Sequence, residues 1–103
     1  MAIKTIEGLK KELHGATQNR KKVRILVELS DRFYLSDSIV ALHYAKEAVK
    51  YSKALADDID KGIALSKYGR CLNKTSDHVK AREILQEALS IFREVGAASE
   101  IPR

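Results

Sequence analysis

The chain has 103 residues and a formal net charge of +5 at pH 7; 45% of its residues are hydrophobic and 32% are charged. This length allows one small domain, and the composition is typical of a folded helical protein and argues against disorder. The longest apolar run, residues 39–42, is far shorter than the roughly 20 residues that cross a bilayer, so we expect no membrane segment. Cys71 is the single cysteine, which excludes an intramolecular disulfide and favours a reducing, cytoplasmic location.

Residues 1–18 predict a short amphipathic helix and a turn. The apolar residues recur every three or four positions, which places them on one helix face; they are Ile3, Ile6, Leu9 and Leu13. Gly15 suits the left-handed cap that ends many helices. We expect this helix to pack on the rest of the domain, because its stripe is short and holds neither Trp nor Phe for a membrane surface.

Residues 19–56 predict a first pair of helices, at about 20–35 and 38–56. A polar stretch around Asp37 separates the two helices. Its side-chain oxygens are suited to cap the free N–H groups of the second helix.

Residues 57–96 predict a second pair of helices, at about 58–73 and 77–95, with Gly96 at the C-terminal end. The turn before this pair is acidic, so its carboxylates stand at the positive end of the next helix dipole. Residues 97–103 lie where a third pair would begin, and we expect the chain to be a segment of a longer protein.

The two pairs repeat one another. The sequence ALHYAKEAV at residues 41–49 returns as AREILQEAL at residues 81–89, about forty residues later. This period indicates stacked helical hairpins, because each repeat buries its apolar face against a neighbour. We therefore expect an all-α fold, in which antiparallel hairpins stack as a short solenoid of about five helices. Such a fold favours binding of a protein or peptide over catalysis.

The spacing of large and small residues resembles the tetratricopeptide repeat. In that family, small residues let the two helices of a hairpin approach closely. The matching residues of the first pair are Leu29, Ser30, Phe33, Ala41, Ala45 and Ala48. Those of the second pair are Tyr68, Gly69, Leu72, Ala81, Leu85 and Ala88. Because glycine in mid-helix costs about 1 kcal/mol relative to alanine, we expect Gly69 to face Ala81 at close range.

The long period, the acidic turn and the sequence GIA at residues 62–64 resemble the repeats of bacterial signalling proteins. In those proteins the repeats lie beside nucleotide cyclase, histidine kinase or transcription-regulator domains. This resemblance implies the N-terminal regulatory part of a larger signalling protein.

The resemblance also implies a partner-binding groove lined by the first helix of each pair. Its residues are Arg24, Val27, Asp31, Tyr34, Ser66, Arg70, Asn73 and Lys74. The basic side chains predict an acidic or extended peptide as partner, and the alternative is a solvated helix face. Val27 and Asp31 replace the Lys and Asn with which some family members hold a chaperone's C-terminal tail, so that activity is not implied.

The last helix predicts self-association. It carries apolar residues on more than one face, namely Ile84, Leu85, Leu89, Ile91 and Phe92. Two repeats bury less apolar surface than the three or more that such arrays usually need. We therefore expect a homo-oligomer formed through Leu85, Leu89 and Phe92, most simply across a two-fold axis.

No pattern in the sequence indicates an active site, a metal site or a cofactor. The three histidines are too far apart for two of them to share a helix face, and the five glycines form no phosphate-binding loop. The basic run at residues 20–24 leaves one alternative function, a basic adaptor that contacts nucleic acid. This run lacks interleaved aromatic residues, which favours a solvated face.

Overall fold

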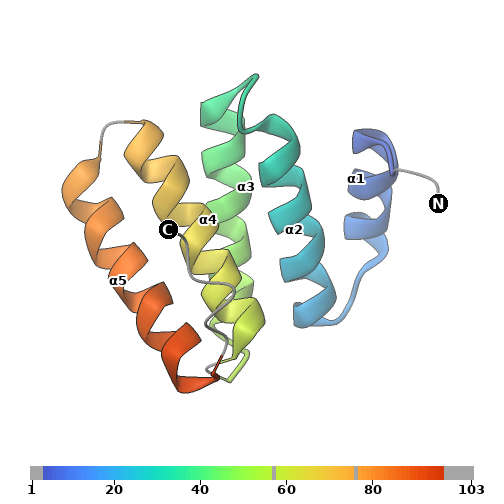
Figure 1. Ribbon diagram of the computed structural model, residues 1–103. Coiled ribbons are helices and arrows are strands. Elements are labelled where there is room, and N and C mark those ends of the chain that lie inside the picture. The colour runs from blue at the N-terminus through green and yellow to red at the C-terminus, as the bar shows by residue number, and fades with distance from the viewer. Residues whose placement is uncertain (1–3, 57, 76, 97–103) are drawn as a thin grey trace.

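The computed structural model describes residues 4–56, 58–75 and 77–96. Within these residues the chain is all-α and forms five helices (Figure 1). They are α1 (Ile6–Gly15), α2 (Asn19–Phe33), α3 (Ser38–Ser52), α4 (Ile59–Lys74) and α5 (His78–Glu94). The tail at residues 97–103, where a third pair would begin, and the expected helical position of Ile3 lie outside the described residues. No helix in the described ranges is long and apolar enough to cross a bilayer.

The helices form antiparallel hairpins that stack side by side, as the repeat predicts. α2 pairs with α3 and α4 pairs with α5, while α3 and α4 join the two hairpins and α1 packs on α2 (Figure 1). Where the hairpins meet, Ala41, Ala45 and Tyr68 belong to one buried cluster. Each hairpin therefore covers apolar surface that the other cannot bury alone.

The repeat extends to the helix caps. Asp37 accepts a hydrogen bond from the backbone N–H of Val40 at 3.2 Å, and Asp77 accepts one from that of Lys80 at 3.3 Å. These bonds satisfy N–H groups that the first turn of a helix leaves unpaired. The second helix of each hairpin thus begins in the same way.

Two helices end earlier than the sequence predicts. α2 ends at Phe33, because the backbone N–H of Asp37 bonds to the Phe33 carbonyl at 2.8 Å and closes the turn to α3. α3 ends at Ser52, whose hydroxyl donates to the Val49 carbonyl at 2.7 Å. Such a local side-chain bond offers the backbone an alternative to continuing the helix.

Only one of the two predicted glycine caps has the expected conformation. Gly96 follows α5 with a φ of 70°, in the left-handed region. The expectation for Gly15 is wrong, since α1 ends instead on Ala16 in an extended conformation, whose N–H bonds to the Leu13 carbonyl at 3.2 Å. A backbone that leaves the helix in an extended direction needs no left-handed residue.

The small residues of the repeat signature lie where helices approach closely. Ser30 is fully buried, and its hydroxyl donates to the Ala41 carbonyl across the first hairpin at 2.9 Å. In the second hairpin, a Cβ added to Gly69 would lie 2.6 Å from Cγ of Leu85 and 3.4 Å from the Ala81 carbonyl oxygen. The close approach at Gly69 is confirmed, but the nearest neighbour is Leu85, whereas Ala81 was expected.

Phe92 does not lie on an uncovered face, so its assignment to a self-association surface is wrong. Its side chain is fully buried, and a Cβ added to Gly62 would lie 2.6 Å from Cε1 of its ring. Because Gly62 has no side chain, the Phe92 ring packs directly on the α4 backbone. Leu85 and Leu89 are only partly buried, and both line an open groove of about 540 Å³ beside α5.

Candidate functional site

The residues expected to line the partner groove come from α2 and α4, and these two helices do touch. Their polar side chains, however, bond to one another. The Asp31 carboxylate pairs with Arg70 at 2.7 Å and with Lys67 at 3.2 Å. We call this set of contacts between α2 and α4 the α2–α4 seam.

Tyr34 forms the next part of the α2–α4 seam. The Arg70 guanidinium lies 3.9 Å and the Lys74 ammonium 4.3 Å from the centroid of the Tyr34 ring, distances at which a cation is attracted to an aromatic face. Lys74 also donates a hydrogen bond to the Tyr34 carbonyl oxygen. Arg70 and Lys74, two of the three cations expected to bind a peptide, therefore have partners within the chain.

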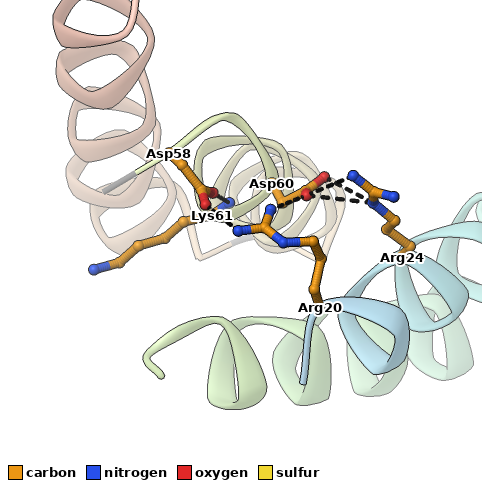
Figure 2. A network of polar contacts seen from close by, with 5 residues as sticks. All are labelled: Arg20, Arg24, Asp58, Asp60 and Lys61. Carbon is orange, nitrogen blue, oxygen red and sulfur yellow. Dashed lines mark hydrogen bonds and ion pairs between the residues drawn. The ribbon is translucent and has the colours of Figure 1, made fainter. Parts of the chain in front are cut away.

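At the other end of the α2–α4 seam, two arginines of α2 reach two aspartates at the start of α4 (Figure 2). Arg20 pairs with Asp58 at 2.6 Å and also with Asp60, and Arg24 pairs with Asp60 at 3.0 Å. Asp60 is buried, with 7% of its surface exposed, so its charge needs these partners. Arg24 is thereby used to hold the two hairpins together.

The same network shifts two pKa values. Burial raises the pKa of the Asp58 carboxyl, but hydrogen bonds from the Arg20 side chain and the Lys61 backbone N–H outweigh it, so the pKa lies below its ordinary value. Hydrogen bonds to Asp58 and then to Asp60 raise the pKa of Arg20. Both shifts favour the charged forms and hence the ion pair.

The remaining residues of the expected groove also serve the fold. Ser66 donates to the Ile63 carbonyl at 3.0 Å, and Asn73 Oδ1 lies 2.6 Å from Nδ1 of His78. Val27 packs against a buried cluster between the hairpins. The structure thus brings the predicted residues together but as an internal joint, in which Arg24, Arg70 and Lys74 are already paired.

Basic side chains of the run at residues 20–24 also have partners within the chain. Arg20 and Arg24 pair with aspartates of α4, and the Lys22 ammonium lies 4.8 Å from the centroid of the Tyr51 ring. Three of the four basic residues of the run thus already have partners within the chain, which leaves fewer of them to neutralise phosphates.

A larger groove lies between α3 and α5, with α4 beneath it. It has a cavity volume of about 710 Å³ and was not predicted from the sequence. Apolar side chains from all three helices line it, namely Val49, Leu65 and Ile84. Lysines also line it, namely Lys46, Lys50, Lys53, Lys61 and Lys80. We call this feature the α3–α5 groove.

Three lysines form a row along the α3 wall of the α3–α5 groove. Lys46 and Lys50 lie in α3, and Lys53 directly follows its last residue with a helical backbone conformation. Their spacing of four and three residues places them on one side of the helix, and all three are exposed. Within the described part of the chain, none of the three forms an ion pair with a carboxylate. This row could have been found in the sequence from its spacing alone.

Lys80 faces this row from α5. Its ammonium lies 5.7 Å from the centroid of the Tyr68 ring, and a hydrogen bond with the Tyr68 hydroxyl raises the pKa of Lys80. This hydrogen bond favours the charged form of Lys80. Its position opposite the α3 row depends on how the hairpins stack, so the sequence contains no local signal for it.

In comparisons with known proteins, no family model matches the chain, and neither a curated protein nor a solved structure matches it.

Proposed function

We propose that the chain is a protein-interaction module that holds a segment of its partner in the α3–α5 groove. One observation carries this proposal: apolar side chains, including Val49 and Ile84, line the groove beside the exposed lysines Lys46, Lys50 and Lys53, none of which forms an ion pair with a carboxylate of the described residues. Apolar contact supplies affinity for a polypeptide segment, and the charges around it supply orientation. The α2–α4 seam offers no such combination, because its cations are already paired.

The walls of the α3–α5 groove belong to different hairpins, so the fold must hold them at a fixed spacing. The packing of α3 on α4 and the ion pairs of Arg20 and Asp31 with residues of α4 do this. A groove that is formed before binding loses less conformational entropy when a partner arrives.

The repeat signature supports a wider proposal. The chain would be a tetratricopeptide-like segment with a regulatory role in a larger signalling protein, and the α3–α5 groove would receive either the partner or another part of that protein. This wider role rests on the resemblance alone.

Self-association is a second candidate, supported by the open groove beside α5. Leu85 and Leu89 line this groove and remain partly exposed, so a second copy of the chain would bury them further. The apolar surface of α5 available for self-association is smaller than the sequence suggests, because Phe92 and Ile91 are already buried within the chain.

The proposal can be tested by selecting peptides from an unbiased displayed library on the immobilised chain. The selected peptides are then titrated into the ¹⁵N-labelled protein, and the changes in amide chemical shift are mapped. We expect the changes to cluster at Val49, Leu65 and Ile84. Failure to select any peptide, or changes confined to the α2–α4 seam or to Leu89, would contradict the proposal.

A further inference from the structure

The charges around the α3–α5 groove indicate the chemistry of its occupant. Among the described residues, five lysines line the groove, and the carboxylates that line it with them are Glu47 and Glu87. Cations thus outnumber anions around an apolar centre. An occupant that complements this lining carries carboxylates at its edges and apolar side chains between them.

The α3 row sets the spacing of those carboxylates. Lys46 and Lys53 are two helical turns apart, which corresponds to a rise of about 10 Å along α3. Lys50 lies between them, and Lys80 stands on the opposite wall. A single short segment can therefore meet cations on both of its sides.

We infer that the α3–α5 groove binds an acidic, amphipathic segment of a partner protein, whose carboxylates pair with Lys46, Lys50, Lys53 and Lys80 while its apolar side chains contact Val49 and Ile84. This inference rests on the proposed function and adds the chemistry of the partner to it. Lys46, Lys50 and Lys53 are solvent-exposed and free of carboxylate partners among the described residues, so binding breaks no existing ion pair there.

A nucleic acid complements this groove less well. Glu47 and Glu87 would repel a continuous phosphate backbone, whereas a peptide can place a basic or neutral residue beside each of them. Tyr68, the tyrosine among the described lining residues, is 6% exposed and offers little surface for a base to stack on.

A second copy of the chain and a lipid surface are also poorer occupants. The chain has a net charge of +5, so two copies that meet at their lysines repel each other. A flat anionic bilayer would reach the exposed lysines but not Leu65, which is 3% exposed at the bottom of the groove.

The test compares the composition and the binding of selected peptides. Peptides selected on the intact chain should be enriched in Asp and Glu around apolar residues. Their affinity should fall about tenfold or more in the variant Lys46→Glu/Lys53→Glu, as expected when two charge pairs become repulsive. The matched control is Lys10→Glu/Lys11→Glu, which makes the same change of charge on the exposed face of α1 and should leave affinity within about twofold.

The outcomes separate this inference from the proposed function. Neutral or basic peptides that bind in the α3–α5 groove would overturn the inference and leave the proposed function standing. Equal losses in both variants would show that only net charge matters and would also overturn it. A DNA duplex or phosphatidylserine vesicles that bind in the groove more tightly than the acidic peptides do would also overturn the inference. That result would identify a nucleic acid or a membrane as the partner. Retained circular dichroism of both variants excludes unfolding as the cause of any loss.

Discussion

The side chain of Leu85 occupies the space that a side chain on Gly69 would need, since a Cβ at Gly69 would lie 2.6 Å from Cγ of Leu85. Real Cβ atoms do not approach other carbon atoms so closely, so glycine is required for α5 to pack on α4 at this point. This contact explains why the chain keeps a glycine in the middle of a helix, where it is otherwise unfavourable.

Gly69→Ala should therefore destabilise the protein although alanine is the better helix former. We expect a net loss of about 1 to 3 kcal/mol in the free energy of unfolding, because the Leu85 side chain or α5 itself must shift to relieve the clash. Gly15→Ala is the matched control, since a Cβ there meets nothing within 4 Å. Urea unfolding would measure both. A double variant with Leu85→Ala should lose less than the sum of the single losses, and full additivity would contradict the contact.

Phe92→Ala should destabilise the chain at every protein concentration. The ring is fully buried against Gly62, and removing a buried phenylalanine typically costs about 3 to 5 kcal/mol. Leu89→Ala, at a partly exposed position of the same helix, should cost clearly less. Unfolding at two concentrations about a hundredfold apart would check this. A loss for Phe92→Ala that appears only at high concentration would restore Phe92 to an oligomer interface.

Much of the fold could be predicted from the sequence because the repeat, the small residues at Ser30 and Gly69 and the Asp37 cap are local signals. The partners of the charged residues could not be predicted. Asp31 meets Arg70, and Arg20 meets Asp60, at sequence separations of 39 and 40 residues. Only the stacking of one hairpin on the next brings these charges together. The sequence alone therefore predicts that these cations are free to bind a partner.

The α3–α5 groove was missed for the same reason. Lys46, Lys50 and Lys53 form a recognisable row, but a row on one helix is usually a solvated face. It becomes one wall of a groove because Lys80 and Ile84 of α5 lie opposite. The error at Phe92 likewise arose from a missing side chain, that of Gly62, whose effect depends on how α5 crosses α4.

The arginine end of the α2–α4 seam should contribute more to stability than the Arg70 end. Arg20→Gln/Arg24→Gln would leave the buried Asp60 carboxylate without its charged partners, at an expected loss of about 1 to 3 kcal/mol. Arg70→Gln should cost about 0 to 1 kcal/mol, because the side chains of Arg70 and Asp31 are 40% and 35% exposed and water screens the pair. Urea unfolding would rank the two variants, and a larger loss for Arg70→Gln would contradict this order.

Stability should fall on acidification in part through Asp58. Its pKa in the folded protein lies below the ordinary value of 3.8, so the unfolded chain binds the proton more tightly. The contribution of Asp58 to stability is therefore fully present at pH values above its ordinary pKa. It is lost as the pH falls through the lower pKa that Asp58 has in the folded protein. The free energy of unfolding should be measured from about pH 6 to about pH 3 for wild type and for Asp58→Asn. We expect the difference between the two proteins to become smaller as the pH falls. A difference that stays constant or grows on acidification would contradict the ion pair with Arg20.

The central claim is that a partner binds in the α3–α5 groove, and the most direct test is to determine which methyl groups of the protein a bound peptide contacts. With methyl-labelled protein and an unlabelled selected peptide, we expect intermolecular nuclear Overhauser effects to the methyl groups of Val49, Leu65 and Ile84. The methyl groups of Val27 at the α2–α4 seam should show none. Contacts at Val27 without contacts at Ile84 would show that the partner binds between α2 and α4, and the α3–α5 groove would no longer be the binding surface.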